Sequence, residues 1–245
     1  MKTHTIDLNT INSTQTWAKE HVAIFDKEAL TCISATSQTH GKGRFQRKWH
    51  SPKTQNIYAT FFFVLPKNTS VTSLAQIMTL SLAKVLKQKD CKIHVKWPND
   101  LYLEGKKLAG VLCETLFDTD FTSVFLGIGV NVNMEQEELN KIDQKATSLK
   151  VETQKTWDTK ALLKELTRSF TEDLNLFKIQ GFEPFHKTFE DLMLYKGEQI
   201  TCRIADQQYE GICHSLTSSG ALNLLLPSQK MMVISSADIE KLNRK

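Results

Sequence analysis

The chain has 245 residues, of which 40% are apolar and 24% charged, a composition typical of a globular protein with a sizeable core. Its formal net charge of +4 is small and dispersed, so charge alone does not indicate a nucleic-acid-binding protein. The five cysteines stand singly and are odd in number, which argues against a disulfide framework or a zinc site and favours buried thiols. The N-terminus lacks the apolar core of a signal peptide, and the longest apolar run, 57–65, is too short to span a membrane. We therefore expect a cytoplasmic protein without a membrane partner.

The first half of the chain alternates strand and helix patterns. The segment 12–15, Asn-Ser-Thr-Gln, looks like an N-cap that leads into a short helix through Trp17, Val22 and Phe25. Residues 30–35 are compatible with a strand. Residues 56–65 are too continuously apolar for an edge strand, which indicates a central strand buried on both faces.

An amphipathic helix is predicted over 74–86, where apolar residues recur at helical spacing. A strand over 92–96 and a break at Pro98 follow, and then a hairpin that turns at Glu104 and Gly105. Residues 121–132 read as a further strand, and 161–177 as a second long helix.

After about Tyr195 the pattern changes to short alternating runs separated by turn signals, which is typical of a small all-β unit. We therefore predict a mixed α+β main domain over 1–192 and a small C-terminal β-barrel domain over 193–245. The alternating runs lie at 199–204, 208–214, 221–226 and 231–234.

A basic, glycine-containing segment at 38–49 follows the predicted strand over 30–35. Glycines let backbone N–H groups crowd an anion, and arginine binds phosphate or carboxylate through two hydrogen bonds. The segment matches neither a P-loop nor a dinucleotide fingerprint. Taken alone, it is equally compatible with a flexible surface loop.

Two further segments, 96–112 and 127–131, combine polar residues with proline or glycine, which restrict or free the backbone. In 96–112, the Pro-Asn-Asp sequence is compatible with a simple turn, and Lys106 and Lys107 with an exposed hairpin end. However, a lysine followed by Leu-Ala-Gly-Val on a buried strand favours the mouth of a pocket. The Gly-Ile-Gly-Val-Asn sequence of 127–131 places glycines inside a strand, where they often mark close approach of a ligand or another backbone.

In this order and spacing, the three segments resemble the catalytic domain of biotin–protein ligases. The family patterns G-R-G-R-x-x-R-x-W, K-W-P-N-D with a downstream K-[LI]-A-G, and G-[IA]-G-[IV]-N match residues 41–49, 96–100 with 107–110, and 127–131. Residues 13–15, Ser-Thr-Gln, look like the family's Ser-Thr-Asn. The resemblance runs from about residue 5 to 190, and the C-terminal unit looks like the family's small terminal barrel.

Two residues depart from the family pattern. Lys42 replaces an arginine, which keeps the charge but loses the planar fork, and Gln15 replaces an asparagine. Some family members carry an N-terminal DNA-binding domain, but barely a dozen residues precede Ser13 here. DNA is therefore not expected as a partner.

The resemblance implies an ATP-dependent biotin–protein ligase. Such an enzyme activates biotin as biotinyl-5'-AMP with release of pyrophosphate, and then transfers biotin to a lysine of a biotin carboxyl carrier protein, an acetyl-CoA carboxylase subunit. ATP with Mg²⁺ and biotin are the implied ligands, and the resemblance leaves homodimer formation open. The implied fold is a mixed sheet flanked by helices, shared with lipoate ligases, plus the small C-terminal barrel.

The resemblance also implies a role for each matched residue. Lys107 and Arg44 would be catalytic, Asp100 would anchor Mg²⁺ indirectly, and the 39–50 loop would close over the adenylate with Arg44 as its latch. Biotin would contact Ser13, Thr14, Gln15, Gln38, Lys42, Gly43, Arg44, Lys107 and Gly110. The nucleotide would contact Arg47, Trp49, Asn99, Lys107, Gly127 and Asn131.

Three alternatives compete with this interpretation. A lipoate or octanoate ligase or transferase would share the fold but lack the K-W-P-N-D block. A biotin-sensing regulator would need a DNA-reading element. A catalytically silent biotin-binding module would not need Lys107, Arg44 and Arg47, because biotin carries a single negative charge.

Overall fold

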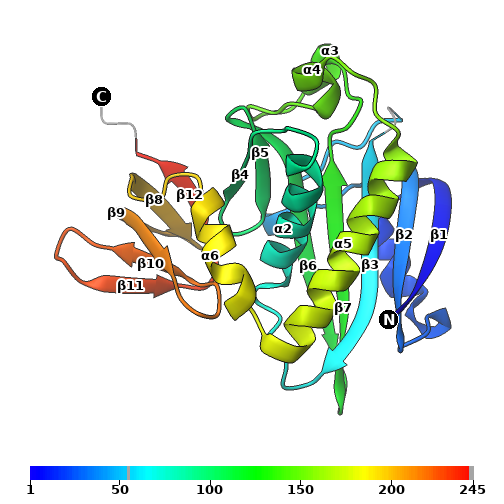
Figure 1. Ribbon diagram of the computed structural model, residues 1–245, viewed down its shortest axis with the longest axis horizontal. Coiled ribbons are helices and arrows are strands. Elements are labelled where there is room, and N and C mark those ends of the chain that lie inside the picture. The colour runs from blue at the N-terminus through cyan, green and yellow to red at the C-terminus, as the bar shows by residue number, and fades with distance from the viewer. Residues whose placement is uncertain (54–55, 243–245) are drawn as a thin grey trace.

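The strands of the protein form two sheets. A computed structural model describes residues 1–53 and 56–242, and within them a seven-stranded mixed sheet has the order β1-β2-β3-β7-β6-β5-β4 (Figure 1). β1 and β2 pair in parallel and the other neighbours are antiparallel. The strands are β1 (Lys2–Ile11), β2 (Ala29–Gln38), β3 (Ile57–Pro66), β4 (Ile93–Lys96), β5 (Asp100–Leu103), β6 (Lys106–Phe117) and β7 (Phe121–Val130).

Helices cover both faces of this sheet. α2 (Leu74–Lys87) and α5 (Thr159–Gln180) lie together on one face (Figure 1), and α6 (Glu183–Leu192) packs on α2. α1 (Thr14–Glu20) and the 3-10 turn η1 (Val22–Ile24) pack on the other face. Two short helices, α3 (Gln136–Leu139) and α4 (Leu149–Thr153), follow β7.

The position of β3 explains its continuous run of apolar residues. Successive side chains of a strand point to opposite faces of the sheet. Phe61 contacts Phe170 of α5 with ring centroids 5.4 Å apart, whereas Phe62 contacts Phe25 on the α1 face at 4.9 Å. The three phenylalanines of β3, Phe61, Phe62 and Phe63, are fully buried. The predicted central strand is confirmed, as are the helices predicted over 74–86 and 161–177.

The predicted hairpin is also confirmed. β5 and β6 are joined at Glu104 and Gly105, whose φ angles of 48° and 74° are the two positive values that a type I′ turn needs. The N-cap of α1 lies within the predicted segment 12–15: it is Ser13, whose carbonyl accepts a hydrogen bond from the Trp17 amide at 2.9 Å. The Asn12 side chain instead accepts from the Ser13 amide at 2.5 Å. The helix ends at Glu20 because the chain there tightens into η1.

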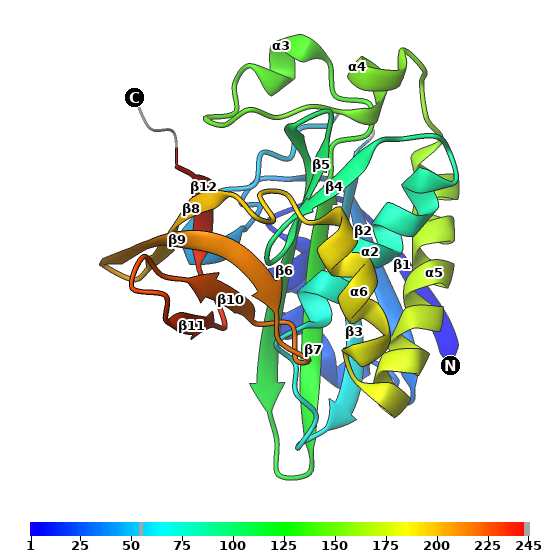
Figure 2. The ribbon, with the colours of Figure 1, turned by 60° about the vertical axis from the view of Figure 1, so that its left-hand side comes forward.

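The C-terminal unit is an antiparallel sheet beside α6 (Figure 2). Among the described residues it has five strands in the order β11-β10-β9-β8-β12, so the expected separate all-β unit is confirmed. Its buried side chains, such as Ile200 and Leu222, belong to the same continuous cluster as the core under α2. The boundary between 192 and 193 stays a prediction. The strands are β8 (Gln199–Ile204), β9 (Gln207–Leu216), β10 (Leu222–Leu225), β11 (Met231–Ile234) and β12 (Asp238–Lys241).

Two general expectations concern the thiols and the membrane. In the described part of the chain the five cysteines are free, and all except Cys113 are buried. Burial raises the pKa of the Cys32 thiol to about 12, so this thiol stays protonated near neutral pH. No helix within residues 1–53 and 56–242 is both long and apolar enough to cross a membrane.

Candidate active site

A pocket of about 830 Å³ lies where α1, the end of β2, the hairpin β5–β6 and the start of β12 meet. The three motif segments, which lie far apart in the sequence, all line it. Lys107 therefore lies in a pocket wall and not at a free hairpin end. Every predicted site residue lines this pocket, namely Ser13, Thr14, Gln15, Gln38, Lys42, Gly43, Arg44, Arg47, Trp49, Asn99, Asp100, Lys107, Gly110, Gly127 and Asn131.

One end of the pocket is a buried network of hydroxyl and amide groups. The Thr14 amide donates to Gln38 Oε1 at 2.8 Å, and Gln38 Nε2 donates to Ser51 Oγ at 3.0 Å. The Thr60 hydroxyl lies 2.9 Å from Thr14 Oγ1 and 3.0 Å from Gln15 Oε1. These contacts fix the amide orientations of both glutamines, so this end is a preorganised set of neutral donors and acceptors.

Glycines in β7 make room for two side chains of the pocket. A Cβ on Gly127 would lie 2.7 Å from Gln15 Oε1, and a Cβ on Gly129 would lie 2.3 Å from the Trp49 ring. The close approach predicted from glycines in a strand is thus made by protein side chains. Gln15 and Trp49 can lie flat on the sheet only because these two positions carry no side chain.

The opposite end of the pocket is cationic. Lys107 Nζ lies 2.7 Å from Asp100 Oδ2, and both side chains are largely buried. The Lys107 ammonium also lies 5.5 Å from the centre of the Trp49 ring, within the range of a cation–π contact. The main chain of Lys107 is held by the following loop, since its amide donates to the Lys145 carbonyl at 3.0 Å and its carbonyl accepts from the Thr147 amide at 2.9 Å.

Lys96 adds a further charge to this end. Burial lowers the pKa of its ammonium, against the opposing effect of Asp100. Lys96 belongs to the K-W-P-N-D motif of residues 96–100, but the resemblance assigns it no role in the site.

The basic loop meets the C-terminal sheet. Arg44 Nη1 donates to Asn99 Oδ1 at 3.0 Å, and its other nitrogen donates to Ser236 Oγ at 2.8 Å. Arg47 forms an ion pair with Asp238. Burial lowers the pKa of the Arg44 guanidinium, while Asp238 and Asp100 raise it. The loop itself contains no acid. Its counter-charge comes from Asp238, which lies more than 190 residues further along the chain than Arg47.

Two polar atoms of the pocket have no protein partner. Within the described residues, Trp49 Nε1 and Asn131 Oδ1 are buried and make no hydrogen bond, although Asn131 Nδ2 donates to the Thr147 carbonyl at 3.0 Å. Buried polar atoms of folded proteins are usually paired. A donor and an acceptor left free in a pocket wall are therefore candidates for direct contact with a bound molecule.

Comparison with known proteins agrees with this geometry. The profile of the biotin/lipoate A/B protein ligase family matches residues 8–131. The chain belongs to this family. It is 31% identical over 220 residues to the bifunctional ligase/repressor BirA of Escherichia coli, covering 89% of this chain and 68% of that protein.

Two further relatives extend this family comparison. Over 210 residues the chain is 27% identical to the biotin–[acetyl-CoA-carboxylase] ligase of Paracoccus denitrificans, with 82% and 86% coverage. The solved structure of the biotin protein ligase from Aquifex aeolicus in complex with biotin and ATP superposes with a TM-score of 0.82 at 29% identity, covering 98% of this chain and 99% of that one. The expected fold and the expected enzyme class, a ligase, are confirmed.

Sequence reasoning missed part of the ligase pocket. Thr60 and Ser51 carry no family motif, and their role appears only when β3 and the loop are folded against α1. Residues 238–240 also line the pocket. Asp238 and Glu240 of β12 lie within the predicted β unit over 193–245 but after its last predicted alternating run, 231–234, so no sequence signal placed them at the site.

Proposed function

We propose that this ligase is an ATP-dependent biotin–protein ligase. It activates biotin as biotinyl-5'-AMP with release of pyrophosphate, and then transfers the biotinyl group to a lysine of a biotin carboxyl carrier protein. The observation that carries the proposal is the polarity of one pocket, which has a neutral hydrogen-bonding end and a cationic end. Biotin has a matching polarity, with a neutral ureido ring at one end and a carboxylate at the other.

The neutral end suits the ureido ring. This ring presents a carbonyl acceptor and two N–H donors. The buried Ser13, Thr14 and Gln15 and the half-buried Gln38 offer both kinds of partner. Lipoate carries an apolar dithiolane in place of this ring and offers these groups no hydrogen bond. The additional hydrogen bonds that biotin would make here favour biotin over lipoate.

The cationic end suits adenylation. In that step a carboxylate oxygen of biotin bonds to the α-phosphorus of ATP, and the bond from that phosphorus to the departing pyrophosphate breaks. Two anions must meet, so fixed cations lower the barrier more than a general base would. Lys107 would neutralise the charge on the phosphate, with Asp100 at 2.7 Å holding its ammonium in place. Arg44 and Arg47 would contact the carboxylate and phosphate from the loop side.

The nucleotide would lie against Trp49 and Gly129 of β7. The unpaired Asn131 Oδ1 and Trp49 Nε1 are a fitting acceptor and donor for it, and Asn99 would complete that wall. The lysine amine of the acceptor protein would then attack the carbonyl carbon of the mixed anhydride and release AMP.

Mg²⁺ would enter with ATP. The described residues contain no group of three side chains suited to hold a metal ion by themselves. Mg²⁺ commonly uses one or two carboxylates together with phosphate oxygens and water, and the Asp100 carboxylate fits that need from its position in the pocket wall. When bound, the ion would shield the phosphate charges.

The test is biotin-dependent exchange of pyrophosphate into ATP, with lipoate and octanoate as control acids. Biotin is expected to support exchange, and lipoate and octanoate are not. Transfer is then measured onto a purified biotin carboxyl carrier domain, with a lysine-to-arginine version of its acceptor site as the matched control. Faster exchange with lipoate than with biotin would replace the proposal by a lipoate ligase, and adenylate formation without any transfer to the carrier domain would remove its second half.

A further inference from the structure

The turn that carries Arg44 and Arg47 has an unfavourable backbone. Phe45 and Gln46 between them have φ angles of 53° and 59°. This left-handed region disfavours residues with a Cβ, and neither residue is of the glycine or asparagine type that tolerates it best. Such a conformation persists only when the surrounding structure holds it.

The turn is held by hydrogen bonds of its own, by the Arg44–Asn99 hydrogen bond, and by contacts with residues 236–238 of the C-terminal unit. Inside the turn, the Gly43 amide donates to the Arg47 carbonyl at 2.7 Å. From outside, Arg44 donates to Ser236 Oγ at 2.8 Å and to the Ala237 carbonyl at 3.3 Å. Arg47 pairs with Asp238, which also lies 3.9 Å from Arg44 Nη1. The segment 236–238, which we call the clamp segment, thus binds both arginines.

The clamp segment is itself fixed in place. Ala237 and Ile239 are buried. The backbone of Asp238 lies opposite that of Arg203 where strands β12 and β8 pair. The sheet is joined to the main domain at a tight turn, where the Gly220 carbonyl accepts hydrogen bonds from Trp97 Nε1 at 3.0 Å and Gln76 Nε2 at 2.7 Å.

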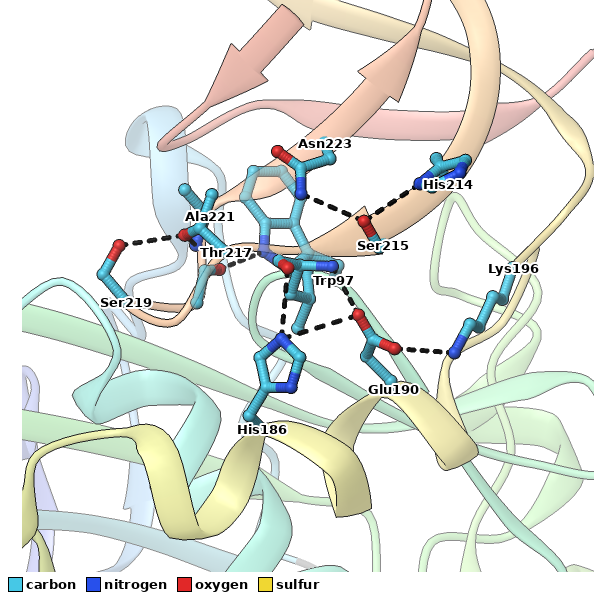
Figure 3. Close-up of polar contacts among 12 residues, drawn as sticks. Trp97, His186, Glu190, Lys196, His214, Ser215, Thr217, Ser219, Ala221 and Asn223 are labelled. Carbon is cyan, nitrogen blue, oxygen red and sulfur yellow. Dashed lines mark hydrogen bonds and ion pairs between the residues drawn. The ribbon is translucent and has the colours of Figure 1, made fainter. Parts of the chain in front are cut away.

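A second junction lies nearby. Figure 3 shows Glu190 of α6 with its partners Lys196 and His186, and the Glu190 carboxylate also accepts from the Leu216 amide at 2.6 Å. The sheet that contains the clamp segment is therefore hydrogen-bonded, through Gly220, to Trp97, which itself lines the pocket.

We propose that the clamp segment holds the Arg44–Arg47 turn closed over the pocket, with Asp238 as a positioning residue for both arginines. The C-terminal sheet is then a working part of the active site. The catalytic consequence rests on the proposed function: a turn held closed retains the reactive adenylate and keeps water from it. Removing the Asp238 charge frees Arg47, weakens the hold on Arg44 and lets the turn relax.

The first test measures the turn without any ligand. The loop offers trypsin four cleavage sites, after Lys42, Arg44, Arg47 and Lys48. The rate of cleavage at these sites in the full-length protein reports how often the loop opens. Asp238→Asn keeps the size of the side chain and should speed cleavage in the loop roughly tenfold. Glu210→Gln is the matched control, since it removes the same charge from an exposed position of β9 in the same sheet and should leave loop cleavage unchanged.

A milder variant guards against general unfolding. Ser236 is exposed, so Ser236→Ala removes one hydrogen bond to Arg44 without disturbing the core. It should speed loop cleavage by about threefold, a size typical of one modest hydrogen bond, and cleavage elsewhere in the chain should not rise. Loop cleavage at the wild-type rate in both Asp238→Asn and Ser236→Ala overturns the proposal.

The second test uses the reaction. Biotinyl-adenylate release from Asp238→Asn should be roughly tenfold faster than from wild type, with a smaller effect on its formation. In an Arg47→Gln background the same Asp238→Asn change should add under about twofold, because its main partner is gone. Faster cleavage with wild-type adenylate release overturns the positioning role. Failure of wild type to exchange pyrophosphate with biotin overturns the proposed function instead, and leaves the trypsin test of the clamp intact.

Discussion

At the scale of single residues, Lys107 shows how neighbours define a catalytic cation. Its ammonium is largely buried between Asp100 and the Trp49 ring. The adjacent Lys106 points away from the pocket, is 44% exposed and pairs with Glu152 at 3.0 Å. Two consecutive lysines of β6 therefore differ in environment, because successive side chains of a strand point to opposite faces.

This contrast gives the first prediction. Lys107→Ala should lower biotin-dependent pyrophosphate exchange by ~10²–10³-fold, the loss typical of one preorganised charge donor, while the Kd for biotin changes far less. Lys106→Ala is the control and should retain near-normal exchange. Equal rates in the two variants would show that the pocket lysine has no special role.

The glycines of β7 give a second prediction that separates the two ends of the pocket. In Gly127→Ala the new Cβ would push Gln15 away from the neutral end, and in Gly129→Ala it would push the Trp49 ring away from the nucleotide wall. Gly127→Ala should raise the KM for biotin roughly tenfold, and Gly129→Ala should raise the KM for ATP by a similar factor. Steady-state kinetics in each substrate check this, and each variant controls for the other. Were both to raise the same KM, the assignment of the two ends would be wrong.

At the scale of elements, the turn between β9 and β10 joins the two sheets. Gly220 has a φ of 86°, and its carbonyl accepts from Trp97 and Gln76. A Cβ at this position would lie 2.2 Å from Gln76 Oε1. The position thus requires glycine both for its backbone conformation and for the space beside it.

The third prediction follows from this turn. Gly220→Ala should lower the free energy of unfolding by about 1–3 kcal/mol, through backbone strain and the displaced Gln76 amide. Urea denaturation measures it. Gly181→Ala is the control for backbone strain alone, because Gly181 also has a positive φ of 67° but open space around its Cα. A larger loss in Gly220→Ala than in Gly181→Ala is expected, and equal losses would mean that the contact with Gln76 contributes nothing.

At the scale of the whole molecule, α6 and the C-terminal sheet are joined by a charged group. Burial raises the pKa of the Glu190 carboxyl, but hydrogen bonds from Lys196 and the Leu216 amide lower it more, so the net pKa lies below its ordinary value of 4.5. His186 lies 3.6 Å from the same carboxylate. A carboxyl whose pKa is depressed in the folded state stabilises that state above its unfolded pKa, and this contribution is lost as the pH falls through the folded pKa.

The fourth prediction uses this sign. Glu190→Gln should cost about 1–3 kcal/mol of unfolding free energy at pH 7, where the charged form accepts its hydrogen bonds. The difference from wild type should shrink as the pH falls below 4.5. Asp191→Asn is the control, because its carboxylate is 58% exposed and pairs with the exposed Lys187. A cost for Glu190→Gln that stays constant from pH 7 to 4 would contradict the charge-based account.

Several elements and the pocket motifs could be predicted from the sequence because their signals are local. The apolar periodicity of α2 and α5, the unbroken apolar run of β3 and the Glu104–Gly105 turn each lie within a few residues of the chain. The motif segments are local as well, and their residues meet in one pocket.

Other features depended on tertiary contacts. β1 is a largely exposed edge strand that pairs in parallel with β2, so it has no buried face to produce an apolar pattern. α6 and β12 were likewise not predicted.

Only the folded chain brings Asp238 to Arg47 and Thr60 to Gln15. These pairs are polar contacts between segments distant in the sequence. The first depends on how the C-terminal sheet meets the basic loop, and the second on how α1 packs on β3. Hydrophobic periodicity and short motifs report on neighbours along the chain. A contact that exists only once two separate elements have docked leaves no such pattern, so the clamp on the basic loop was decided by the tertiary structure.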